Sequence, residues 1–304
     1  MKVNWNGVMP ALTTKFTKED TLDLQMFKTN LDTQLKAGVN GIILGGTLGE
    51  ASTLTPEEKR ELTRFAKEAV GDRVPVIMNV AEQTTKGAIR AVEIAEEDGA
   101  SGIMILPPMR YRADERETVE FFRQTAKSTS LPLMIYNNPI DYKIEVTLDM
   151  FEQLLKEDNI QAVKESTRDI TNVTRLINRF GDRLKVLTGV DTIAMESLVM
   201  GADGWVAGLV CAFPRESVAI YRLVKAGRIE EARKIFRWFL PVLELDIVPK
   251  LVQNIKLAEV ATGIGTENVR APRLQLEGEE RQQVQKIIDD AVANRPVIEE
   301  TVLQ

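Results

Sequence analysis

Residues 39–80, VNGIILGGTLGEASTLTPEEKRELTRFAKEAVGDRVPVIMNV, contain the pattern that decides the fold. An apolar run from Val39 to Leu44 precedes a helical stretch, and a second apolar run follows from Val74 to Val80. The helix opens with Thr55-Pro56-Glu57-Glu58, which supplies an N-cap threonine, a proline at the first helical position and acidic residues in the first turn. This order of strand, helix and strand predicts two parallel strands joined by a helix.

The same pattern recurs along the chain. Short runs rich in Val, Ile, Leu and Met lie at Gly7 to Leu12, Val39 to Leu44, Val74 to Val80, Gly102 to Leu106, Leu131 to Ile135, Ile160 to Val163, Leu184 to Leu187 and Gly204 to Val206. Each is followed by a stretch of helical periodicity, which is typical of parallel strands buried on both faces. No G-x-G-x-x-G follows an early strand, so a dinucleotide-binding doubly wound sheet is disfavoured. The sequence predicts a (β/α)₈ TIM barrel.

After Gly208 the pattern is helical only. The helices are expected at Glu216 to Lys225, at Ile229 to Ala261 with a break around Pro241 and Pro249, and at Glu277 to Ala293. We therefore expect two parts, a barrel over residues 1–212 and a C-terminal helical region over residues 213–304. The amphipathic faces of these helices are expected to pack on the barrel or on another subunit.

The amino-acid composition excludes several kinds of catalytic and metal-binding site and disfavours some partners. The 304 residues include no histidine, which excludes histidine-based catalytic triads and histidine-ligated zinc sites. Cys211 is the single cysteine, so an internal disulfide is impossible and a reducing cytoplasm is the expected compartment. The formal net charge is −6, and no basic patch, signal peptide or apolar run of membrane-spanning length is evident. The expected partner is a small molecule rather than nucleic acid or a membrane.

Two residues at predicted strand ends carry the chemistry. Lys164 follows the apolar run Ile160 to Val163, so its ammonium group is expected at the mouth of the barrel, where a desolvated lysine can attack a carbonyl. The structural alternative is a salt bridge with Glu165 or Asp191. Tyr136 ends the preceding strand, and because neighbouring strands lie ~4.8 Å apart its phenol can serve Lys164 as a proton shuttle. Its alternative is packing at the barrel rim.

A glycine-rich segment, Gly45-Gly46-Thr47-Leu48-Gly49-Glu50, follows the second predicted strand. Glycines permit close approach of the backbone, and free amide groups in such a loop can hold an anion such as a substrate carboxylate. The alternative is an ordinary tight turn between a strand and a helix.

Four ordered motifs resemble the family of dihydrodipicolinate synthase and N-acetylneuraminate lyase, the pyruvate-type class I aldolases. Residues 46–50 resemble the G-T-T-G-E loop, Tyr136-Asn137-Asn138-Pro139 resembles Y-N-x-P, Lys164-Glu165 follows an apolar strand, and Gly189-Val190-Asp191 resembles G-x-D. The resemblance covers the whole chain. It implies a TIM barrel with C-terminal helices, no metal and no organic cofactor, and homo-oligomers, either dimers or tetramers.

The resemblance also implies the site. Lys164 would form a Schiff base with a 2-oxo acid, Tyr136 would move protons, and Thr47 would act both in catalysis and in holding the carboxylate. The substrate is expected to contact a set made of Gly46, Thr47, Leu48, Asp141, Gly189 and Val206.

Three positions depart from the pattern of the synthases. Leu48 stands where a second threonine is usual, Met109 roughly where a tyrosine is usual, and Asp141 where an arginine is usual. Tyr111 lies two residues beyond Met109 and is the nearest replacement for the missing tyrosine. An aspartate in place of the arginine would repel the carboxylate of an incoming aldehyde.

Three stretches, Leu-Pro-Pro-Met at 106–109, Tyr-Asn-Asn-Pro at 136–139 and Gly-Trp-Val-Ala-Gly-Leu-Val-Cys-Ala-Phe-Pro at 204–214, resemble the dehydratases and deaminases of the family, which form the same Schiff base and then eliminate a leaving group. The member activity expected here is deamination of 1-pyrroline-4-hydroxy-2-carboxylate. In this mechanism Lys164 condenses with C2, the iminium acidifies C3, and Tyr136 or a water removes the C3 proton while the C4 hydroxyl departs.

Other functions remain open on sequence alone. Within the enzymes, they are dihydrodipicolinate synthase itself, which condenses pyruvate with aspartate semialdehyde, and another 2-oxo acid aldolase. A metal-dependent aldolase would have to use Asp and Glu alone as ligands. A non-catalytic sensor of 2-oxo acids would report binding through the C-terminal helices.

Overall fold

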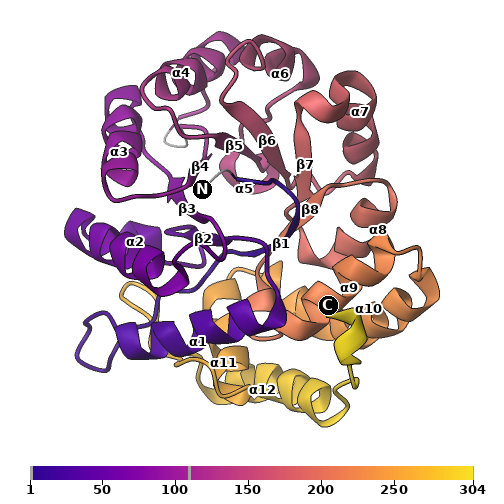
Figure 1. Cartoon of the computed structure of the whole chain (residues 1–304). Helices are drawn as coiled ribbons and strands as arrows, with labels where there is room; N and C mark the ends of the chain where they lie inside the picture. Colours follow the sequence, from indigo (N-terminus) through magenta and orange to yellow (C-terminus); the bar gives the residue numbers. More distant parts are fainter. Residues whose placement is uncertain (1–2, 109–110, 304) are drawn as a thin grey trace.

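Eight parallel strands form one sheet in the part of the chain that the computed structural model describes, residues 3–108 and 111–303. They are β1 Gly7–Pro10, β2 Ile42–Leu44, β3 Val76–Val80, β4 Gly102–Ile105, β5 Leu133–Asn137, β6 Ile160–Glu165, β7 Lys185–Thr188 and β8 Gly204–Ala207. The order is β1-β8-β7-β6-β5-β4-β3-β2, and a parallel bridge between Ala11 and Ile43 joins its two ends. Helices surround the strands (Figure 1). The predicted TIM barrel is confirmed.

Every predicted apolar run contains a strand, because runs of β-branched and aliphatic residues suit strands covered on both faces. Four strands extend further than the apolar runs, β7 and β8 by one residue and β5 and β6 by two. β5 continues through Tyr136 to Asn137, and β6 continues through Lys164 to Glu165. The two candidate catalytic side chains therefore project from regular, hydrogen-bonded backbone rather than from loops.

The helices alternate with the strands as far as β8. They are α1 Leu24–Ala37, α2 Pro56–Val70, α3 Thr85–Glu97, α4 Glu115–Lys127, α5 Pro139–Tyr142, α6 Leu148–Leu154, α7 Ile170–Phe180, α8 Ala194–Val199, α9 Pro214–Lys225, α10 Ile229–Leu243, α11 Leu251–Ala261 and α12 Gly278–Ala293. The sequence signal for the start of α2 is confirmed, since Thr55 and Glu58 form a reciprocal capping box around Pro56. Among the described helices, none combines the length and the apolar character needed to cross a membrane.

The C-terminal helices show the break that was expected around Pro241 and Pro249. Pro241 itself still lies within α10. This is tolerated because Pro241 occupies the last turn, where the loss of one backbone hydrogen bond is followed at once by the end of the helix at Leu243. The break falls after it, in the 3₁₀ turn η5 (Glu244–Asp246) and the segment that precedes α11.

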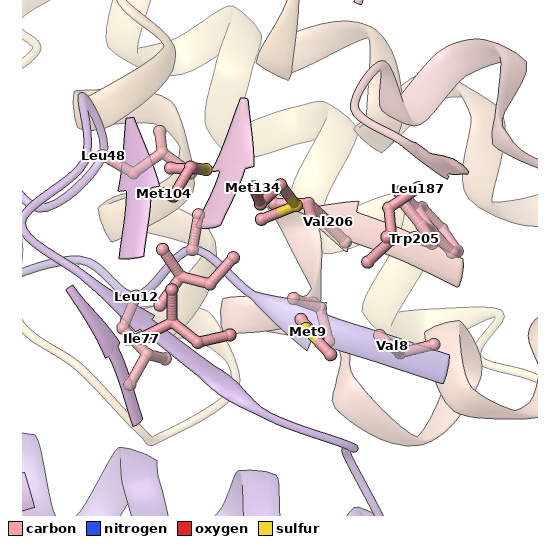
Figure 2. Packing of buried hydrophobic residues seen from close by; sticks show 14 of the residues in the cluster. Val8, Met9, Leu12, Leu48, Ile77, Met104, Met134, Leu187, Trp205 and Val206 are labelled. Atoms are coloured by element: carbon pink, nitrogen blue, oxygen red, sulfur yellow. The ribbon is translucent and has the colours of Figure 1, made fainter. Parts of the chain in front are cut away.

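The helix α9 packs against β1, β8, α1 and α8 and so completes the ring around the sheet. Helix α11 contacts α1 through the hydrogen bond from Asn30 to Glu259, and α12 packs against α10 and α11 (Figure 1). A single cluster of buried side chains fills the barrel and continues beneath its helices. Figure 2 shows members of this cluster, among them Leu12, Ile77 and Val206, packed between the strands.

Candidate active site

A cavity of about 400 Å³ opens at the carboxyl ends of the strands. Every residue of the predicted site lines it, namely Gly46, Thr47, Leu48, Tyr136, Asp141, Lys164, Gly189 and Val206. These residues come from distant parts of the sequence, so their convergence is a property of the barrel.

Lys164 is buried at one side of the cavity, with 8% of its surface exposed. Within the described residues, neither carboxylate that was considered as a salt-bridge partner pairs with it. Glu165 accepts hydrogen bonds from Asn172 Nδ2 at 2.9 Å and from the backbone N–H of Thr167 at 2.8 Å. Asp191 is likewise occupied by other donors. Burial lowers the pKa of Lys164, which increases the fraction of neutral amine available as a nucleophile.

Gly189 makes room for the lysine. A Cβ atom at this position would lie 2.6 Å from both Cγ and Cε of Lys164 and 2.2 Å from Oγ of Ser166. Any larger residue would therefore displace the lysine from its present position. The contact explains why a glycine stands at the end of β7 opposite the reactive side chain.

Tyr136 is the register partner of Lys164 across β5 and β6. The Nζ atom of Lys164 lies 4.0 Å from the centroid of the phenol ring. The hydroxyl of Tyr136 accepts a hydrogen bond from Asn138 Nδ2 at 3.2 Å, and burial raises the pKa of this phenol to about 12. The neutral phenol can therefore donate a proton beside the lysine.

The glycine-rich loop faces this pair. Gly45 has a φ of +65°, a conformation that glycine adopts without strain, and its carbonyl accepts a hydrogen bond from Asn79 Nδ2 at 2.9 Å. The hydroxyl of Thr47 lies 3.2 Å from the hydroxyl of Tyr142. The ring of Tyr142 packs edge-on against that of Tyr136, with centroids 5.3 Å apart. Hydroxyl groups from three segments thus lie along one wall of the cavity.

The proposed replacement for the missing tyrosine is wrong for this cavity. Tyr111 is 57% exposed and lines a different hollow, with Pro108 and Phe121. Met109, the residue at the departing position, lies outside the described residues. Tyr142 lines the cavity instead, and it was missed because its hydroxyl bond to Thr47 joins residues 95 positions apart.

Two charged residues of the cavity wall were also missed. Arg168 follows β6 with a left-handed φ of +63°, and Asp246 comes from η5 in the C-terminal region. Arg168 could have been identified from the sequence, because it lies shortly after the predicted strand that ends in Lys164. No sequence signal places Asp246 here, because only the return of the chain across the barrel mouth brings it to the cavity.

Asp141 lies at the cavity wall but is exposed to solvent. Its carboxylate accepts a hydrogen bond from Asn138 Nδ2 at 2.7 Å, and its backbone N–H donates to Asn138 Oδ1 at 3.2 Å. Asn138 thus caps the short helix α5 and also fixes the Asp141 side chain near Tyr136.

Residues 4–291 match the Dihydrodipicolinate synthetase family. The chain belongs to the dihydrodipicolinate synthetase family. It is 31% identical over 275 residues to the 4-hydroxy-tetrahydrodipicolinate synthase of Exiguobacterium sibiricum, covering 90% of this chain and 92% of that protein. It is 27% identical over 288 residues to the synthase of the same name from Oceanobacillus iheyensis, covering 95% and 98%.

Solved structures of the dihydrodipicolinate synthetase family agree with this assignment. The dihydrodipicolinate synthase of Bacillus anthracis superposes with a TM-score of 0.90 at 27% identity, covering 94% of this chain and 98% of that one. The 4-hydroxy-tetrahydrodipicolinate synthase of Methylacidiphilum fumariolicum gives a TM-score of 0.90 at 26% identity, covering 95% and 96%. As a member of this family, the protein is a class I lyase that acts on a small molecule.

Proposed function

We propose that the protein is a Schiff-base lyase that eliminates the C4 hydroxyl of a small 2-oxo or 2-imino acid, with 1-pyrroline-4-hydroxy-2-carboxylate as the expected substrate. The observation that carries this choice is Asp141, whose carboxylate Asn138 holds at the cavity wall at 2.7 Å. A fixed negative charge there disfavours a second substrate that carries its own carboxylate and leaves room for one that presents a hydroxyl.

The catalytic roles follow from the positions of the side chains. Lys164 attacks C2 as the neutral amine that burial favours, and the resulting iminium acts as the electron sink. Tyr136 lies against the Lys164 ammonium and moves protons during formation of the imine. Thr47 and the backbone around Gly46 hold the substrate carboxylate, while Leu48 and Val206 supply apolar contacts.

The test is a panel of substrates with all products measured separately. Purified protein is expected to release ammonia and a semialdehyde from 1-pyrroline-4-hydroxy-2-carboxylate, in equal amounts, without consuming pyruvate. A chelator is expected to leave the rate unchanged, and sensitivity to it would favour the metal-dependent alternative. Absence of ammonia release, together with consumption of pyruvate and aspartate semialdehyde, would reject the proposal.

One observation favours the synthase as the second candidate. Arg168 lines the cavity from the loop after β6, and its guanidinium makes no ion pair within the described residues. An unpaired guanidinium can bind the carboxylate of a second substrate, as a synthase requires. The relatives above carry the synthase name at about 30% identity, and the same panel of substrates separates the two candidates.

Replacing Asp141 with Arg is expected to shift the protein towards the synthase. The substitution removes the fixed negative charge, so elimination should fall by roughly 10-fold, while weak use of aspartate semialdehyde with pyruvate should appear. Steady-state rates with both substrates measure the change. Borohydride trapping of pyruvate serves as the control and should be unaffected, because Asp141 is exposed and does not contact Lys164. A wild-type protein that already condenses these two substrates efficiently would contradict the assignment.

We further infer that the protein works in the cytoplasm as a homo-oligomer, either a dimer or a tetramer. Cys211 supports the reducing compartment, since it is buried as a free thiol whose pKa burial raises. The oligomeric state is supported by the family resemblance of the whole chain.

A further inference from the structure

Asp246 is a cavity residue that the roles above do not use. It ends the 3₁₀ turn η5 (Glu244–Asp246), between α10 and α11, and lines the same cavity as Lys164 and Tyr136. Its side chain is half-buried. Within the described residues, Asp246 is the charged residue that the C-terminal region contributes to the cavity lining.

The end of β8 is shaped to admit this carboxyl group. A Cβ atom at Gly208 would lie 2.6 Å from Oδ1 and 2.9 Å from Cγ of Asp246, so any larger residue would displace this carboxyl group from its present position. The backbone of Gly208 is fixed in turn, because its N–H and that of Leu209 donate to the Asp191 carboxylate, the latter at 2.8 Å. Asp246 therefore lies beside a fixed stretch of backbone, in the wall of the cavity that Lys164 and Tyr136 also line.

Asp246 accepts no hydrogen bond within the described residues. Asp141, the other carboxyl group in the cavity lining, accepts one from Asn138, and the neighbouring Asp191, which is buried and does not line the cavity, accepts one from Trp205 Nε1 at 2.9 Å as well as from the backbone. A carboxyl group that lines a cavity without an internal partner is available to hydrogen-bond a bound substrate.

The charge environment favours the protonated form of this group. Burial raises the pKa of Asp246 well above its ordinary value, and the negative charges of Asp191 and Asp141 add to the effect. Lys164 and Arg168 are the positive groups that oppose it. A carboxylic acid in this state can donate a proton as well as accept one.

The proposed elimination needs such a donor at C4. Lys164 and Tyr136 act at C2 and C3, and neither accounts for the proton that a departing hydroxide must receive. We propose that Asp246 is the general acid of the reaction and delivers its proton to the C4 hydroxyl as the bond from C4 to oxygen breaks. This inference rests on the proposed elimination and extends it.

The step balances in atoms and electrons. The C3 proton passes to a water, or to Tyr136 after this phenol has given its own proton during formation of the imine, and the electron pair of that bond forms the double bond between C3 and C4. The pair of the bond from C4 to oxygen leaves with the hydroxyl, which takes the Asp246 proton and departs as water. Asp246 becomes a carboxylate and regains a proton through solvent, so no oxidant or reductant is required.

The test compares two leaving groups in the Asp246→Asn variant. Asparagine keeps the size of the side chain but cannot act as a general acid. With the 4-hydroxy substrate, kcat is expected to fall by about 100-fold. With the 4-fluoro analogue it should fall by less than about 10-fold, because fluoride departs with little need for a proton. Glu244→Gln is the matched control, since Glu244 lies in the same turn, is exposed and does not line the cavity.

The outcomes separate this inference from the function on which it rests. Borohydride trapping of pyruvate should remain in Asp246→Asn, which shows that the variant folds and forms the imine. Wild-type protein that does not eliminate water or fluoride from either substrate overturns both proposals. Wild-type protein that eliminates both, with an Asp246→Asn variant that is unchanged or equally impaired on the two leaving groups, overturns the role of Asp246 alone.

Discussion

Replacing Lys164 with Arg is expected to lower turnover by roughly 10⁴-fold or more, the loss typical of removing a covalent nucleophile. Arginine keeps a positive charge, but its guanidinium stays protonated and cannot attack C2. The wild-type protein should be inactivated by borohydride in the presence of a 2-oxo acid, with the added mass on Lys164. The variant should acquire no added mass under the same conditions.

The matched control is Lys250→Arg. Lys250 is an exposed lysine that pairs with Glu280 and does not line the cavity. This variant should keep wild-type activity and trapping. Peptide mapping that places the reduced adduct on Lys15 or Lys250 would contradict the assignment. Tolerance of Arg at position 164 with ligand binding intact would favour the non-covalent sensor.

Replacing Glu50 with Gln is expected to destabilise the protein by about 3–5 kcal/mol. Glu50 ends the glycine-rich loop and pairs with Lys256 of α11 at 2.5 Å, with both side chains fully buried. It also accepts the backbone N–H of Arg270 at 3.0 Å. Glutamine would leave the Lys256 ammonium buried without the charge of Glu50. Breaking a buried ion pair in this way costs far more free energy than breaking an exposed one. Urea denaturation followed by circular dichroism measures the loss.

A double variant tests whether the uncompensated charge is the cause. Glu50→Gln combined with Lys256→Met removes both charges, so it should recover a substantial part of the stability lost in Glu50→Gln. Asp32→Asn removes one partner of the exposed pair with Lys28 and should cost less than about 1 kcal/mol. A double variant no more stable than Glu50→Gln would show that the uncompensated charge of Lys256 is not the cause of the loss.

The barrel and much of the site were predictable from local sequence patterns. Apolar runs marked the strands, and the residue after each run marked the end where the cavity forms. Lys164 and Tyr136 were found this way because β5 and β6 are adjacent, so two strand ends close in sequence are also close in space. The register of the two parallel strands then places Tyr136 directly opposite Lys164 at the mouth of the barrel.

The remaining site residues depend on information that local patterns do not hold. Tyr111 and Tyr142 both follow strands closely in the sequence. Only the path of the backbone places Tyr111 at the surface and Tyr142 beside Thr47. Asp246 reaches the cavity because η5 packs against η3 and places this side chain beside Gly208, a tertiary contact without a sequence signature. The break around Pro241 and Pro249 was predictable from the two prolines, although the residue at which α10 ends, Leu243, was not.

The buried pair between Lys15 and Glu259 has a consequence for how the chain is made. Lys15 Nζ lies 2.9 Å from Glu259 Oε1, with both side chains fully buried and 244 positions apart in sequence. During synthesis the amino-terminal part leaves the ribosome long before its partner exists. Closing the barrel around Lys15 before α11 is in place would bury this ammonium without its counter-charge, which is costly. A chain that ends before α11 is therefore expected to leave Lys15 in contact with water and this part of the barrel open.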